Sequence, residues 1–162
     1  MAEITIKLAT IGDVPALIEL RTAFLAEAMG DNPGAPGLIE ALSQYFLGTL
    51  PSGEFVAFLA LAGDRPIAAS GLVFRRLPPI SQNLSGMEGY IMNMYTAPEW
   101  RGRGIASTLL KELLAVARQA NCHRIRLHSF PQAAPVYLRM GFVPVAGEME
   151  WKTEEDGRGG EI

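Results

Sequence analysis

Apolar and polar residues alternate over several short stretches of this chain, and a two-residue period is typical of a β-strand with one buried face. At residues 3–9 the alternation places Ile4, Ile6 and Leu8 on one side. Later stretches are more continuously apolar and are bounded by glycine and proline turns, which mark strand ends. The pattern predicts about seven strands, at residues 3–9, 54–62, 67–76, 87–96, 124–129, 142–146 and 148–153.

Four other stretches repeat their apolar residues every third or fourth position, which is the period of an amphipathic helix. Pro15 fits the opening turn of the first stretch, and Gly141 fits the end of the last. In the third stretch, Ile105, Leu109 and Leu113 form one apolar stripe. We therefore expect about four helices, at residues 14–29, 38–50, 107–120 and 132–140.

Length and charge limit the class of protein. The 162 residues are enough for one domain with its own core, and neither a repeat nor a linker interrupts them. We place the domain at residues 1–153 and expect the polar, glycine-rich residues 154–162 to form a frayed tail. The formal net charge of −3 disfavours nucleic acid as a partner.

Cysteine content and hydropathy bear on where the protein works. Cys122 is the one cysteine of the sequence, so the monomer has no internal disulfide, and this suits a reducing compartment. No apolar run has the length of a signal-peptide core or of a membrane span. We expect a cytoplasmic protein that does not contact a membrane.

The most informative stretch is the hexapeptide Arg-Gly-Arg-Gly-Ile-Ala at residues 101–106, which joins a predicted strand to a predicted helix. Its glycines have no Cβ, so the backbone can come close to a ligand. The first N–H groups of the following helix lack internal partners. These donors, the helix dipole and two arginines together predict a site for an anion, most naturally a phosphate or pyrophosphate.

Two familiar phosphate-binding loops do not match this stretch. A P-loop needs Lys followed by Ser or Thr after its last glycine, and neither stands there. The dinucleotide fingerprint has its third glycine or alanine three positions after Gly104, where this chain has Ser107. That fingerprint also belongs to the first strand–helix turn, whereas residues 101–106 follow several strands that look like hairpins.

Residues 101–106 match the pattern Arg/Gln-x-x-Gly-x-Gly/Ala, and residues 137–142 match Tyr-x-x-x-Gly-Phe. Both motifs, in this order of elements over residues 3–153, resemble the GNAT superfamily of acyl-CoA-dependent N-acetyltransferases. The resemblance implies a single α/β (α+β, mixed-sheet) domain, with a central, mostly antiparallel twisted sheet of about seven strands flanked by about four helices. It also implies an enzyme that transfers an acetyl group from acetyl-CoA directly to a primary amine, without a metal.

The resemblance further implies which residues bind the cofactor. The amides of the 101–106 loop would hold the pyrophosphate of coenzyme A, and the pantetheine arm would lie beside residues 94–96. The acetyl thioester would sit where the strands at 87–96 and 124–129 part, and a backbone N–H near Met94 or Tyr95 would polarise its carbonyl. The implied cofactor-binding residues are Met94, Tyr95, Thr96, Arg101, Gly102, Arg103, Gly104, Ala106 and Ser107.

Two proton transfers need catalytic groups. Tyr137 matches the family's position for the acid that protonates the departing thiolate. An alkylammonium has a pKa near ~10.4, so a base or a water chain must first take a proton from the amine.

Glu88 is the first candidate for that base, because alternation places it on one face with Tyr90, Met92 and Met94. His128, on the neighbouring strand, is the second, since histidine ordinarily titrates near neutrality. A bulge in the strand, which the family often has, would change which residues share that face.

An acetyl-cysteine intermediate on Cys122 is a different chemistry. Cys122 follows the helix that begins near Gly104, and a rise of ~1.5 Å per residue puts it about 25 Å from the loop. We therefore expect direct transfer in a ternary complex.

The acceptor is expected to be a small-molecule or peptide amine, shaped by residues 20–50 and 77–86. Carboxylates that would attract a cationic acceptor are Glu27, Asp31, Glu40 and Glu88. The resemblance leaves a homodimer open, because the family often dimerises. Two other functions remain: a non-catalytic acyl-CoA sensor or interaction module on the same fold, and a nucleotide-binding protein of another class.

Overall fold

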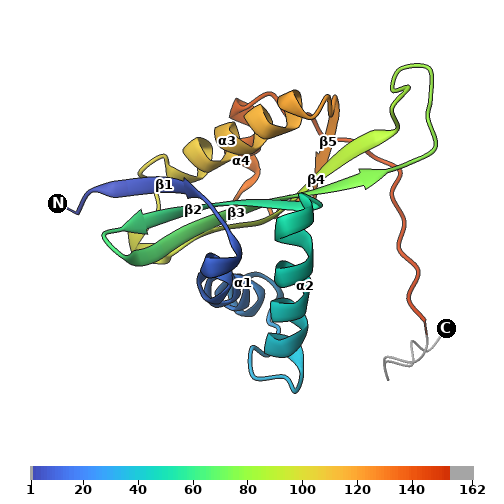
Figure 1. Cartoon of the computed structure of the whole chain (residues 1–162). Coiled ribbons are helices and arrows are strands. Elements are labelled where there is room, and N and C mark those ends of the chain that lie inside the picture. The colour runs from blue at the N-terminus through green and yellow to red at the C-terminus, as the bar shows by residue number, and fades with distance from the viewer. Residues whose placement is uncertain (1, 154–162) are drawn as a thin grey trace.

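Five strands form one mixed sheet at the centre of the computed structural model, which describes residues 2–153 (Figure 1). Their order across the sheet is the order in the chain. Neighbours among the first four strands are antiparallel, whereas the last strand is parallel to the fourth. The strands are β1 (Ile4–Leu8), β2 (Phe55–Ala62), β3 (Arg65–Arg76), β4 (Met87–Thr96) and β5 (Arg124–Leu127).

Helices cover both faces of this sheet. They are α1 (Val14–Met29), α2 (Leu38–Ser52), α3 (Ile105–Gln119) and α4 (Ala134–Arg139), with 3-10 turns at Ile11–Asp13 and Pro98–Trp100. In Figure 1, α1 and α2 lie on one face and α3 and α4 on the other. Because a parallel neighbour needs a long connection, α3 serves as the crossover from β4 to β5. The predicted mixed sheet with four helices is confirmed.

Alternation along the strands divides the apolar side chains into two cores, one on each face. Leu109 and Leu113 of α3 are fully buried against β2, β3 and β4, so the predicted stripe is confirmed. On the opposite face, Leu17 of α1 and Phe46 of α2 pack with Phe55. The sheet is thus packed between two apolar layers, which hold its strands, and the strand ends where the site lies, in place.

The two strands predicted at residues 142–146 and 148–153 are wrong, because residues 142–153 form no strand. Pro144 has no N–H to donate to a strand ladder. Gly147 has φ of 104°, which interrupts an extended chain. Val143 and Val145 are exposed, although they alternate as a strand would. The sheet therefore has five strands where about seven were expected.

None of the helices between residues 2 and 153 combines the length and the apolar character that crossing a lipid bilayer requires. The tail predicted at residues 154–162 lies outside the described residues.

Gly71 of β3 tests how tightly the core beside β4 is packed. A Cβ on Gly71 would lie 2.5 Å from the ring of Phe55 and 3.0 Å from the carbonyl oxygen of Met92. We expect Gly71→Ala to lower the free energy of unfolding by about 1–3 kcal/mol, because the buried ring must shift. Urea denaturation measures this change.

Gly48→Ala is the matched control, since a Cβ there meets no atom within 4 Å. Gly48 lies inside α2, so this variant should gain about 0.5–1 kcal/mol from the higher helix propensity of alanine. Equal effects of the two substitutions would contradict the packing described for Gly71.

Candidate active site

β4 and β5 pair over only a short distance and then part. Their register runs from Glu88 opposite Arg124 to Ile91 opposite Leu127, whereas β4 stays paired with β3 as far as Thr96. Beyond Ile91, no strand in the described part of the chain pairs with the β5-facing edge of β4. That edge presents backbone N–H and C=O groups to which an extended ligand can add β-type hydrogen bonds.

A β-bulge interrupts β4 beside this opening. On β3, Ser70 alone stands opposite two residues of β4, Asn93 and Met94. Asn93 has φ of 60°, a left-handed conformation that asparagine tolerates better than most residues. Arg21 of α1 donates a hydrogen bond of 2.7 Å from Nη1 to Oδ1 of Asn93. The bulge is therefore held in place from α1.

The bulge also decides which side chains share a face. Met92 packs with the core beneath α1 and α2, but Met94 packs with the core beneath α3. Glu88 and Tyr90 precede Met92 at two-residue spacing and share its face. The prediction that Met94 shares the face of Glu88 is therefore wrong, because the extra residue reverses the alternation after Met92.

The 101–106 loop holds two glycines in the left-handed conformation. Their φ angles are 74° at Gly102 and 76° at Gly104, and a Cβ on either would meet no atom within 4 Å. The backbone conformation favours glycine, and the space beside the loop is open to a ligand. Gly104 begins α3 without a side-chain hydrogen bond to the helix N–H groups, so these donors remain for an anion.

The two arginines of the loop are braced by the protein itself. Arg101 donates from Nε to the carbonyl of Thr96 at 2.9 Å and forms an ion pair of 2.7 Å with Glu27 of α1. Arg103 donates to the carbonyl of Glu99 at 3.1 Å, and its guanidinium stacks over Trp100 at 4.6 Å. Both side chains thus fix the shape of the loop, and its backbone amides are the groups left for a ligand.

The 137–142 motif has a local structural cause. Tyr137 lies in α4, and its carbonyl accepts a hydrogen bond of 3.1 Å from the N–H of Phe142. Gly141 permits this closure with φ of 94°, and the aromatic rings then meet edge to face at 5.9 Å. Tyr137 is buried in the core beneath α3, and this burial raises the pKa of its phenol to about 12.

Glu88 lies at the start of β4 and is only 2% exposed. Its Oε2 contacts Arg75 at 2.7 Å, and its Oε1 contacts Arg126 at 3.2 Å and Arg124 at 3.4 Å. Both oxygens are therefore engaged by guanidinium groups. At ~3.4 Å per residue, Glu88 is about 20 Å along the strand from Met94.

Glu88 and Tyr137 are not brought together, because they lie on opposite faces of the sheet. His128, by contrast, follows the last residue of β5, where the two strands part. It is exposed, and its ring meets Phe130 edge to face at 5.4 Å. Phe130 in turn contacts Phe24 of α1, so this end of the opening has an aromatic wall.

Sequence patterns alone missed two features of the site. An asparagine inside an otherwise apolar strand is a signal for a bulge, because asparagine is depleted in strands and tolerates positive φ. Arg124 and Arg126 at two-residue spacing predict one basic face on β5. Nothing local in the sequence indicates that Arg21 reaches Asn93, which lies 72 positions away.

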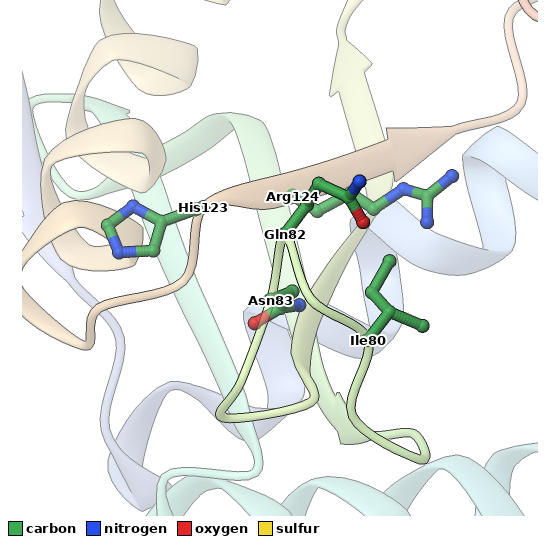
Figure 2. Close-up of a pocket in the computed structure, with 5 residues that line it drawn as sticks. All are labelled: Ile80, Gln82, Asn83, His123 and Arg124. Carbon is green, nitrogen blue, oxygen red and sulfur yellow. The ribbon is translucent and has the colours of Figure 1, made fainter.

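An open hollow of about 360 Å³ lies at the other end of β5, against the loop between β3 and β4. Figure 2 shows the residues that line it. His123 and the guanidinium of Arg124 point in opposite directions there. The lining residues are Ile80, Gln82, Asn83, His123 and Arg124. They include neither a nucleophile nor a carboxylate, so this hollow is not the candidate active site. In residues 2–153, no three His, Cys, Asp or Glu side chains are placed to bind a metal ion.

Cys122 is buried behind the sheet. Its Sγ lies 3.4 Å from the carbonyl of Arg124, and a Cβ on Gly89 would be 3.4 Å from that sulfur. Burial raises the pKa of the thiol, which disfavours the nucleophilic thiolate. A packing role for Cys122 follows from this environment.

Comparison with known proteins agrees with the geometry. Residues 20–142 match the model of the acetyltransferase (GNAT) family. An aminoglycoside N(6')-acetyltransferase type 1 of Stenotrophomonas maltophilia is 30% identical over 121 residues, which are 75% of this chain and 72% of that protein. A glucosamine 6-phosphate N-acetyltransferase of Trypanosoma brucei brucei is 30% identical over 54 residues, 33% of this chain and 37% of that protein.

Among solved structures, a predicted acetyltransferase of Clostridium acetobutylicum with acetyl-CoA is 30% identical, with a TM-score of 0.87. The superposition covers 96% of this chain and 100% of that one.

Cys122 also provides a test of the buried environment behind β4. We expect the thiol of the native protein to react with a chromogenic disulfide reagent far more slowly than the thiol of the urea-unfolded chain. Because its pKa is raised, the native rate should increase only at a pH above the ordinary thiol value of about 8.5. The sequence has one cysteine, so each rate reports on Cys122 alone. Equal native and unfolded rates near neutral pH would contradict the burial.

Proposed function

This chain belongs to the GNAT family of acetyltransferases, and on that premise we propose that it transfers an acetyl group from acetyl-CoA to a primary amine. The observation that carries the proposal is the parting of β4 and β5 beside a glycine loop that begins α3. An unpaired strand edge and a set of free helix amides suit the two halves of coenzyme A, its extended pantetheine arm and its pyrophosphate.

The residues present fit this cofactor. Open space lies beside Gly102 and Gly104, where a diphosphate needs close approach to backbone amides. We propose that amides of residues 102–107 bind the pyrophosphate and that residues 94–96 hydrogen-bond the pantetheine arm. The C. acetobutylicum structure, which has acetyl-CoA, supports this choice of donor.

We propose that the bulge of β4 activates the acyl group. The register shift leaves Asn93 and Met94 together opposite Ser70, and a backbone N–H near Met94 or Tyr95 can then donate to the thioester carbonyl as negative charge develops. The amine nitrogen then forms a bond to the acyl carbon, and the carbon–sulfur bond breaks. Tyr137 donates its phenolic proton to the departing sulfur, and its phenolate then takes up the excess proton of the newly acylated nitrogen.

For the proton of the incoming ammonium group, we propose water or His128 as the acceptor in place of Glu88. Both carboxylate oxygens of Glu88 are engaged by arginines, and its side chain is almost fully buried. His128 is exposed and directly follows the end of β5. An amine at the opening therefore has a shorter path to His128 or to solvent.

The acceptor is proposed to be a small-molecule amine. Two curated relatives carry names of enzymes that acetylate an aminoglycoside and glucosamine 6-phosphate, and both of these compounds contain an amino sugar. Two of the four carboxylates expected to attract a cationic acceptor are already paired, since Glu27 contacts Arg101 and Glu88 contacts the arginines around it.

Gly104→Ala tests the cofactor site. We expect CoA to bind about 10-fold or more weakly to this variant, because a lost backbone hydrogen bond to a charged phosphate is worth about 1.5 kcal/mol or more. Isothermal titration with CoA measures the affinity. Gly53→Ala is the matched control, because its φ of 76° equals that of Gly104 and its Cβ also meets no atom within 4 Å. The control should have similar backbone strain but the CoA affinity of the native protein. Unchanged CoA affinity in Gly104→Ala would contradict the proposal that the 101–106 loop binds the pyrophosphate.

Tyr137→Phe tests the proposed acid. Release of free thiol from acetyl-CoA, measured across a panel of primary amines, should occur with the native protein. The variant should lose about 100-fold to about 10,000-fold in kcat without a change in CoA affinity. Tyr45→Phe on α2 is the control and should keep kcat. Thiol release by neither protein, with CoA bound to both, would favour a non-catalytic acyl-CoA module.

The pH profile follows from the raised pKa of Tyr137. The phenol must be protonated to act, and its pKa of about 12 keeps it protonated as the pH rises from about 7 to about 10. Activity should therefore show no alkaline fall from Tyr137 in that interval.

A further inference from the structure

Three arginines surround a single buried carboxylate on the face of the sheet that α1 and α2 cover elsewhere. Arg75 comes from β3, and Arg124 and Arg126 come from β5; we call these three residues the arginine cluster. Glu88 stands between them on β4, opposite Arg75 on one side and Arg124 on the other. Its contacts to the three guanidinium groups measure 2.7, 3.4 and 3.2 Å.

The cluster carries more positive than negative charge. Three guanidinium groups face one carboxylate, and a buried carboxylate balances only one of them. Arg126 turns its Nη1 to a second carboxylate, that of Glu148, at 2.7 Å. Glu148 lies on the exposed segment after α4 and is 70% exposed. The cluster thus binds a second carboxylate, that of Glu148, from the surface. Three positive charges then face two negative ones, so the cluster keeps a net positive charge.

The guanidinium groups are accessible although Glu88 is not. Their side chains are 43% exposed at Arg75, 49% at Arg124 and 28% at Arg126. Arg75 also makes a cation–π contact, with its guanidinium carbon 5.3 Å from the ring centroid of Tyr90. In residues 2–153, the terminal nitrogens of Arg124 form no hydrogen bond or ion pair. Guanidinium edges of this kind bind carboxylate or phosphate oxygens in pairs.

The cluster lies at a fixed distance from the proposed transfer site. Arg126 stands opposite Tyr90, which is two residues before Met92 on the same face. At ~3.4 Å per residue, the bulge at Asn93 and Met94 begins about 10 Å along the strand. The opening between β4 and β5 begins at Met92, two residues beyond the row of Tyr90 and Arg126 and four beyond the row of Glu88 and Arg124. A ligand reaching from that point to the cluster therefore spans roughly 7–14 Å.

We propose that the arginine cluster binds an anionic group of the acceptor, so that the substrate class is an amine carrying a carboxylate or phosphate roughly 7–14 Å from its nitrogen. This inference rests on the proposed acetyl transfer at the β4–β5 opening. Glu88 is a positioning residue in this account: it orients the three guanidinium groups and does not touch the substrate. Glu148 takes the place of the ligand's anion on Arg126.

Matched amines test the inference directly. Aminohexanoate is compared with aminohexanamide, and aminopentyl phosphate with aminopentanol, so that each pair differs only in the anionic group. Thiol release from saturating acetyl-CoA gives KM and kcat for each amine. We expect the native protein to have a KM about 10-fold or more lower for at least one anionic member than for its neutral partner. The pair that shows the difference identifies carboxylate or phosphate as the anion.

Arg124→Gln should remove that preference, because within residues 2–153 Arg124 has one contact of 3.4 Å to Glu88 and no partner at its two terminal nitrogens. The KM for the anionic amine should rise about 10-fold, while the KM for its neutral partner and both kcat values stay the same. Arg75→Gln is a second cluster variant with the same expected direction. Arg65→Gln is the control, since Arg65 lies at the other end of β3 and pairs with exposed Glu99. Urea denaturation confirms that each variant is folded.

The outcomes separate the two proposals. Equal KM values within both pairs, or an unchanged preference in the two cluster variants, overturn the inference and leave acetyl transfer standing. Absence of thiol release with every amine overturns acetyl transfer instead. In that case, calorimetric titration of the same four amines into the CoA-bound protein decides the inference: tighter binding of an anionic member, lost in Arg124→Gln, supports it, and equal binding within both pairs overturns it.

Discussion

The early end of the pairing between β4 and β5 is the constraint on which the site depends. β5 stops at Leu127, whereas β4 continues to Thr96 with β3 as its one partner strand in the described structure. Backbone donors and acceptors on the other edge of β4 need partners, and an extended ligand can supply them. The same strand leads through the 101–106 loop into α3, so the strand edge and the helix amides lie in one continuous segment.

The bulge at Asn93 changes which face of the sheet the side chains of this segment occupy. Its extra residue sends Met94 into the core beneath α3 and leaves Met92 on the opposite face. Arg21 holds the bulge from α1, and Arg101 ties the end of the strand to Glu27 of the same helix. α1 therefore braces both ends of the unpaired edge.

The local charge at one end of the sheet is opposite in sign to the net charge of the protein. The chain is acidic overall, with a formal net charge of −3. Arg75, Arg124 and Arg126 nevertheless gather around Glu88 and make one end of the sheet basic. Cross-strand neighbours come from positions far apart in the chain. The overall composition therefore does not predict the sign of the electrostatic potential at this end of the sheet.

Local chemistry was enough to determine the strands from β1 to β5, the four helices and the two glycine-containing motifs. Periodicity, helix ends and turn residues act over a few neighbouring positions, as the closure of Gly141 and Phe142 onto Tyr137 illustrates. Only the tertiary structure decided that residues 142–153 form no strand, that Met94 leaves the face of Glu88, and that Glu88 is held by three arginines. The last two depend on partners from other elements, since Arg21 of α1 holds the bulge and the arginines around Glu88 come from β3 and β5. Pairing between distant segments is not encoded in the period of either segment alone.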